Sequence, residues 1–374
     1  LGVNARRRPH GGPRRSVAAA RPPLPRGRWG PRIRPYKLSL STYYELVLRA
    51  EDILRRLLVS DRYDSVSNFL SLYNAYTESG RPLREVFADF VPRTRPFKKN
   101  CVGLGLELIR RWRCLETYFK GIRKATALLS CEESVNDLES YVTYTHGPYD
   151  LLAPDKEHVL VGIPINLDGR RGILIADPGY HIARIVTVMV DGIEPHTGWF
   201  NQSNEPEGTK DFCYVYNKTN PDYVEWQERV VRNEEIKNQV ALIYTPRQYC
   251  DGIRITEKRN LVCKLRSFVT RDYTGRVVAG IGFNLRSTYQ DMAFSLFYRM
   301  NRRSRKFKFK FSTFTNINTV DDNILNHVYI CNSQMSLPNG KLLSLIQKLN
   351  LVVSDVSFTT QCLEMNAHIC QLCF

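Results

Sequence analysis

The sequence predicts an α+β protein with a helical N-terminal part and a strand-rich remainder. Apolar residues recur with helical spacing between about residues 40 and 112, and period-two alternation takes over beyond about residue 138. A chain of 374 residues is also long enough for two or three structural units. Helices first and strands later is the pattern of α+β folds.

The N-terminal residues 1–36 differ in composition from the rest of the chain. They contain ten arginines, seven prolines, five glycines and no acidic residue. Such a segment buries too little apolar surface to offset the entropy of ordering, so we expect a disordered basic tail. With the basic run at residues 302–310, it accounts for nearly all of the net charge of +17. A solvated tail is favoured over one that contacts nucleic acid or an acidic membrane surface.

Residues 37–132 are expected to form a helical domain. Thr42 and Glu45 match a capping box, and an apolar face follows at Leu46, Ile53, Leu54, Leu57 and Leu58. Further helices are predicted at about residues 65–76 and 83–90.

Cys101 falls at the first position of the next predicted helix. Asn100 is a favourable N-cap, and apolar residues then recur at Leu104, Leu108, Ile109 and Trp112. The positive end of the helix dipole, with Lys98 and Lys99 beside it, favours a thiolate. Cys101 is therefore a candidate nucleophile, and the alternative is a small residue where a helix packs closely.

Residues 133–245 are expected to form a β-barrel domain. Asp168-Gly169 is a strong two-residue hairpin signal between predicted strands at residues 158–165 and 171–177. Pro164 indicates an edge position or a bulge in the first of these strands. Other strands are predicted at residues 141–144, 182–190, 212–216 and 240–244, and a charged helix is predicted at residues 223–238.

This hairpin brings a histidine and an aspartate together. With a two-residue turn, Asp177 lies opposite Leu160, and His158 shares a face with Leu160. Asp177 can then fix the orientation of His158, whose other ring nitrogen faces a nucleophile. A three-residue turn would place the two side chains on opposite faces, and each residue alone is more often structural. Their order after Cys101 nevertheless indicates a Cys-His-Asp triad.

Residues 246–335 are expected to form an α/β lid, and residues 336–374 a C-terminal extension. Strands are predicted at residues 261–271, 277–283 and 306–313, and helices at residues 319–328 and 342–349. Near the end of the lid, three phenylalanines alternate with Lys306, Lys308 and Lys310, which gives one apolar and one basic face. A half-buried strand with a solvated basic face is favoured over an anion-binding surface.

The ten cysteines lack the regular framework of a small secreted domain and indicate free thiols in the cytoplasm. Cys370 and Cys373, near His368, have no second cysteine pair, so no metal is expected. No apolar run reaches the length of a membrane span, and the arginine-rich start leaves a transit peptide open.

The triad and its setting resemble the arylamine N-acetyltransferase family, a branch of the papain and transglutaminase-like cysteine enzymes. Cys101 matches the nucleophile of the family, and Glu157-His158-Val159-Leu160-Val161 contains its histidine. Asp177-Pro178-Gly179-Tyr180 is similar to its Asp-x-Gly-aromatic element, and residues 261–283 to the strand pair that opens its third domain. The resemblance covers about residues 37–335 and implies a helical domain, a β-barrel and an α/β lid.

The resemblance also implies a function: a monomeric enzyme that moves an acetyl group from acetyl-CoA to a small-molecule amine. His158 would take the proton of Cys101, and the acyl-enzyme would be discharged to the amine. Amides at the helix start, including that of Val102, would stabilise the oxyanion. Lys306, Lys308 and Lys310 would suit the phosphates of the donor.

One segment departs from the family pattern. Phe97-Lys98-Lys99-Asn100-Cys101 stands where family members usually carry Arg-Gly-Gly-x-Cys. Two alternatives therefore stay open, namely a cysteine hydrolase or transglutaminase-like enzyme and an inactive member that acts as a binding protein. His181 is the second candidate for the base.

Overall fold

The computed structural model describes residues 24–371, except residues 26, 95–98, 133–134, 136, 144–156, 206–207, 233–234 and 302. The helices in this part of the chain are α1 (Leu40–Ser60), α2 (Ser67–Ser79), α3 (Leu83–Asp89), α4 (Cys101–Trp112), α5 (Ile122–Ala125), α6 (Leu138–Thr143), α7 (Lys258–Val262), α8 (Asp322–Gln334), α9 (Lys341–Ser354) and α10 (Val356–Gln371). The strands are β1 (Trp29–Arg32), β2 (Tyr36–Leu38), β3 (Tyr63–Asp64), β4 (Ala127–Glu132), β5 (His158–Leu167), β6 (Arg170–Ala176), β7 (Val186–Met189), β8 (Phe200–Glu205), β9 (Gly208–Tyr216), β10 (Tyr223–Arg232), β11 (Glu235–Tyr244), β12 (Arg247–Tyr249), β13 (Leu265–Arg271), β14 (Val277–Asn284), β15 (Ala293–Met300) and β16 (Arg303–Lys310).

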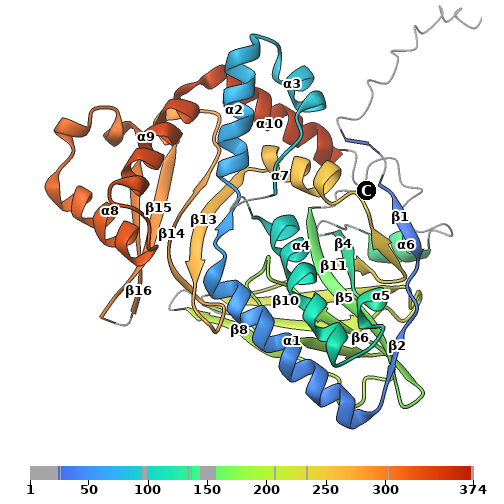
Figure 1. The fold of residues 1–374 in the computed structure, drawn as a ribbon. Coiled ribbons are helices and arrows are strands. Elements are labelled where there is room, and N and C mark those ends of the chain that lie inside the picture. The colour runs from blue at the N-terminus through green and yellow to red at the C-terminus, as the bar shows by residue number, and fades with distance from the viewer. Residues whose placement is uncertain are drawn as a thin grey trace, which may run out of the picture.

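A curled antiparallel sheet supports the N-terminal helices α1 and α4 (Figure 1). Its strands follow the order β7-β6-β5-β4-β11-β10-β9-β8, and β2 pairs with β5 in parallel. β7 also lies close to β9, which shows the curl of the sheet. Helices and antiparallel strands thus occur together, as expected for an α+β protein, while the division into three domains stays a prediction.

A second antiparallel sheet has the order β16-β15-β14-β13-β3. Its last strand, β3, comes from the N-terminal part of the chain, so this sheet joins segments about 200 residues apart. Helix α8 packs against β14 and β15, and α10 lies against α3, α7 and α9 (Figure 1). The described part of the C-terminal extension, up to residue 371, is therefore largely helical and contacts the rest of the protein.

Several predicted elements are wrong, and tertiary pairing explains the largest difference. Residues 223–238 form β10 and the start of β11 instead of a helix, because Val224 and Trp226 alternate into the core and β10 pairs on both sides. The predicted strand at residues 141–144 is replaced by α6, as far as the structure describes it. The end of the predicted tail contains β1, which pairs with β12, and β2, while residues 1–23 lie outside the described residues.

The N-cap of α1 is Ser39, so the capping box predicted at Thr42 is also wrong. The Ser39 side chain accepts the backbone N–H of Thr42, and the helix begins at Leu40. A capping hydroxyl three residues earlier thus satisfies the first turn.

The β5–β6 hairpin has the predicted register. Leu167 pairs with Arg170 across the two-residue turn, and Val161 pairs with Ala176. Pro164 does not mark an edge strand, because β5 is paired on both sides. It falls between the last residue paired to β4, Gly162, and the first residue paired to β2, Ile165. The proline therefore occupies the gap where one side of β5 needs no ladder donor.

The hairpin turn predicts a stability effect at Gly169. Asp168 and Gly169 have φ values of 50° and 89°, and a side chain at Gly169 would meet no atom within 4 Å. Gly169→Val should therefore lower the free energy of unfolding by about 1–2 kcal/mol through backbone strain alone. Urea unfolding measures this loss, and Gly169→Asn should lose less because asparagine tolerates positive φ. An equal loss in both variants would contradict the strain explanation.

Candidate active site

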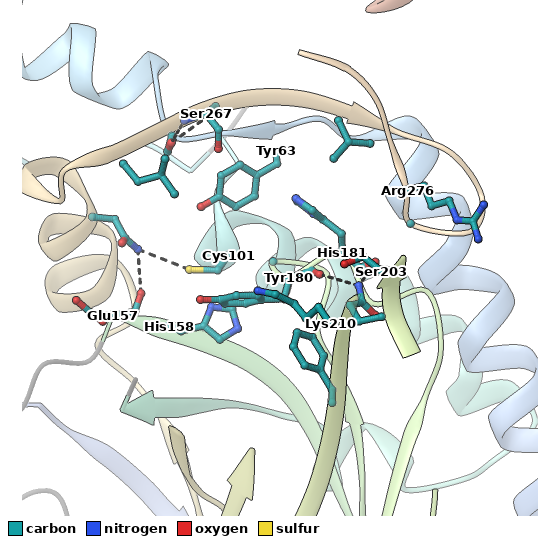
Figure 2. Close-up of a pocket in the computed structure, with 18 of the residues that line it drawn as sticks. Tyr63, Cys101, Glu157, His158, Tyr180, His181, Ser203, Lys210, Ser267 and Arg276 are labelled. Carbon is teal, nitrogen blue, oxygen red and sulfur yellow. Dashed lines mark hydrogen bonds between the residues drawn. The ribbon is translucent and has the colours of Figure 1, made fainter. Parts of the chain in front are cut away.

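A cavity of about 470 Å³ opens beside the first residue of α4 (Figure 2). Residues of both sheets, of α4 and of α7 line the cavity. They include Tyr63, Cys101, His158, Tyr180, His181 and Asn260. The three predicted triad residues therefore lie at or directly behind one cavity wall.

Cys101 is buried, with 4% of its surface exposed, at the start of α4. Asn100 caps the helix as predicted, and its Oδ1 accepts the N–H of Val102 at 3.0 Å. The structure describes one of the two cations expected beside the thiol. Lys99 forms an ion pair with Asp61, and Lys98 lies outside the described residues.

His158 and Asp177 meet as the hairpin register predicted. His158 Nε2 lies 2.8 Å from Asp177 Oδ2, and both side chains are almost fully buried. Burial alone lowers the pKa of His158, but the charge and hydrogen bond of Asp177, with a hydrogen bond to Cys101, outweigh it. The pKa of His158 is therefore raised well above its ordinary value, and the ring can hold a proton at neutral pH.

The segment after β6 packs directly against His158 and Cys101. Asp177 Oδ1 accepts the N–H of Tyr180 at 3.0 Å, which leaves Oδ2 for His158. The Tyr180 ring packs edge-on against His158, with ring centroids 4.7 Å apart. Gly179 lies very close to both Cys101 and His158. A Cβ atom at Gly179 would lie 2.7 Å from Cys101 Cβ and 2.8 Å from His158 Cε1.

His181 lines the same cavity but is held in another role. Arg271 donates a hydrogen bond from Nη1 to His181 Nδ1 at 2.9 Å, so this nitrogen carries no proton. Burial and the charge of Arg271 lower the pKa of His181 well below its ordinary value. A ring fixed in this way is a poorer base for Cys101 than His158.

Lys306, Lys308 and Lys310 do not line this cavity in the described structure. They alternate along β16 with Phe307 and Phe309, which are half-buried, so the predicted two-faced strand is present. The cations on the cavity wall are instead Lys210 and Arg276. Lys210 is paired with Glu228 at 2.8 Å, and Arg276 is exposed at the rim.

Two features near Cys101 differ from the predicted oxyanion environment. The Val102 amide, expected at the oxyanion, is occupied by the Asn100 cap. In its place the Asn260 side chain, 159 residues away in the chain, lies with its amide nitrogen 3.7 Å from Cys101 Sγ. No local motif marks Asn260, because only the packing of α7 against the start of α4 brings it there.

Neither a metal site nor a membrane helix is found in the part of the chain that the structure describes. No group of three or more His, Cys, Asp or Glu side chains among the described residues is arranged to hold a metal ion, and no described helix is long and apolar enough to span a bilayer. Cys373 of the cysteine pair lies outside the described residues.

Glu257 is a buried carboxyl group near the Asn100 cap. It ends a π-helical turn, Ile253–Glu257, and accepts a hydrogen bond from Asn68 at 2.7 Å. Burial raises its pKa to about 8, while hydrogen bonds from Asn68 and Asn100 oppose the rise only partly. Glu257 is therefore mostly protonated at neutral pH.

Comparisons with known proteins give one remote likeness. No known family and no curated protein matches the chain. Among solved structures, an arylamine N-acetyltransferase from Mycobacterium abscessus is similar at 7% sequence identity and a TM-score of 0.43, over 82% of this chain and 88% of that one. At that identity and TM-score, the likeness does not identify a family for the chain.

The position of Gly179 predicts a loss of thiol reactivity in Gly179→Ala. The added methyl group must push Cys101 away from His158, and such a displacement should slow alkylation of Cys101 by iodoacetamide about 100-fold. Mass spectrometry of the labelled peptide measures this rate. Gly30→Ala is the control, since its nearest neighbour would lie 3.6 Å away. Unchanged labelling in Gly179→Ala would contradict the close packing.

The raised pKa of Glu257 predicts a pH-dependent stability. The stabilisation from protonated Glu257 is complete below the unfolded-state pKa of 4.5 and is lost as pH rises through about 8. Glu257→Gln stays neutral and does not lose this stabilisation. As pH rises over this range, the free energy of unfolding of the unaltered protein should therefore fall by a few kcal/mol relative to that of the variant. Urea unfolding at a series of pH values measures the difference. A difference that does not vary with pH would contradict the raised pKa.

Proposed function

We propose that the protein is a cysteine-dependent acyltransferase that moves an acyl group from a thioester to an amine. One observation carries the proposal: His158, paired with buried Asp177, stands beside Cys101 at the wall of a cavity. Nucleophile, base and orienting carboxylate are the parts that covalent acyl transfer needs. An assembled pair of this kind favours an enzyme over an inactive binding protein.

The reaction follows from these roles. Asp177 holds Nε2 of His158, which leaves Nδ1 for the thiol proton of Cys101. The thiolate attacks the thioester carbonyl, and the imidazolium returns the proton to the departing thiol. The amine then attacks the acyl-enzyme, with His158 as base again, and Cys101 is released.

The donor and acceptor are further parts of the proposal. The sequence resemblance implies acetyl-CoA, and exposed Arg276 at the rim, with Lys210 farther along the wall, suits its phosphates better than the lysines of β16. Aromatic rings of Tyr63, Tyr180 and Phe212 line the cavity and can pack against a flat amine. We therefore propose acetyl-CoA as donor and a small aromatic amine as acceptor.

Cys101→Ala tests the proposal directly. The variant should lose transfer of acetyl groups from acetyl-CoA to an aromatic amine by at least about 1,000-fold, because the proposed acyl-enzyme forms on the Cys101 thiol. Cys114→Ala, which removes an exposed thiol, should keep full activity. Appearance of the free thiol of coenzyme A over time, read with a thiol reagent, measures the reaction.

Two outcomes would contradict the proposal. Cys101→Ala with undiminished transfer would show that the cysteine is not the nucleophile. Peptide cleavage by the unaltered protein without acetyl-CoA, lost in Cys101→Ala, would instead identify a cysteine hydrolase. Labelling by iodoacetamide adds a check, since buried Cys101 should react faster than exposed Cys114 and Cys250 only if it is activated.

A further inference from the structure

We infer that the side-chain amide of Asn260 stabilises the oxyanion that forms when Cys101 attacks a carbonyl group. The inference rests on the proposed function and adds a donor to the same site. The Val102 amide, which was expected to donate to the oxyanion, already donates to Asn100 Oδ1 at 3.0 Å. A donor that replaces the Val102 amide is therefore sought among the side chains near Cys101.

The orientation of the Asn260 amide is fixed by its neighbours. Its Nδ2 donates to the backbone carbonyl of Glu157 at 3.1 Å and lies 3.7 Å from Cys101 Sγ (Figure 2). A carbonyl oxygen only accepts, so the amide nitrogen, not the oxygen, must face this side. One N–H is used by Glu157, and the other is directed toward the thiol and the substrate that binds it.

The amide is held before any substrate arrives. Arg259, the preceding residue, is buried and donates to Asn366 of α10 at 2.8 Å and to Glu157 at 2.7 Å. The backbone carbonyl of Asn260 accepts from Arg266 at 2.7 Å. A donor fixed from both sides loses little energy to reorientation, which is the condition for electrostatic stabilisation. The C-terminal helix α10 thereby takes part in positioning the site.

The step that Asn260 assists is the first one. The Cys101 thiolate forms a C–S bond to the thioester carbon, and the C=O π electrons move to the oxygen. Asn260 Nδ2–H donates to this oxyanion. The electron pair then re-forms the carbonyl, the bond to the original thiol breaks, and that thiol leaves with the proton from His158.

Two reagents separate this role from a structural one. p-Nitrophenyl acetate acylates Cys101 through an oxyanion, whereas iodoacetamide alkylates it by displacement at a saturated carbon. Asn260→Ala should slow acylation about 100- to 1,000-fold and change alkylation less than about fivefold. Stopped-flow release of p-nitrophenol and mass spectrometry of the labelled peptide give the two rates. Asn260→Ser, a smaller polar substitution, repeats the comparison.

Two further variants complete the experiment. Asn350→Ala removes a buried amide that binds Tyr289 outside the cavity and should leave both rates unchanged. Asn366→Ala loosens Arg259 and should slow acylation by less than Asn260→Ala does. Equal loss of both rates in Asn260→Ala and Asn260→Ser, or no loss of acylation, would overturn the assignment while the proposed function stands. Failure of the unaltered protein to be acylated at Cys101 would overturn both.

Discussion

The site depends on the register of one hairpin. A two-residue turn between β5 and β6 places His158 and Asp177 on the same face, and a shift of one residue would move one of them to the opposite face. The hairpin is central to the curled sheet, because β5 is also paired with β4 and with β2. The imidazole and the carboxylate are thus positioned by backbone pairing on rigid strands, and only Cys101 has to be supplied from a helix.

Small residues allow the close approach of that helix. Gly179 packs against both Cys101 and His158, and a Cβ atom at Gly105 on α4 would lie 2.8 Å from Leu128. Helix and sheet therefore approach closely at the point where the thiol must meet the imidazole. The two constraints act together, because the register aims the imidazole and the glycines let the thiol reach it.

What the sequence could predict follows from how local each signal is. The helix start at Cys101, the turn at Asp168-Gly169 and the pair of His158 with Asp177 depend on residues close in the chain, and the structure has all three. The helix predicted at residues 223–238 is wrong. The charges there suggest a helix, but pairing with β9 and β11 makes β10 a strand. Contacts such as Arg271 with His181 join segments 90 residues apart, and no local pattern indicates them.

The start of α4 also shows that two uses of a helix N-terminus compete for the same amide. A side-chain cap satisfies a first-turn amide, and an oxyanion site needs such an amide to be free. The residues directly before Cys101 include a strong cap, Asn100, which stabilises the helix but removes the Val102 donor. A side chain from outside the first turn can take the place of the capped amide. The chain offers one on α7, whose position depends on Arg259 and on the C-terminal helix, so that helix belongs to the site as much as to the fold.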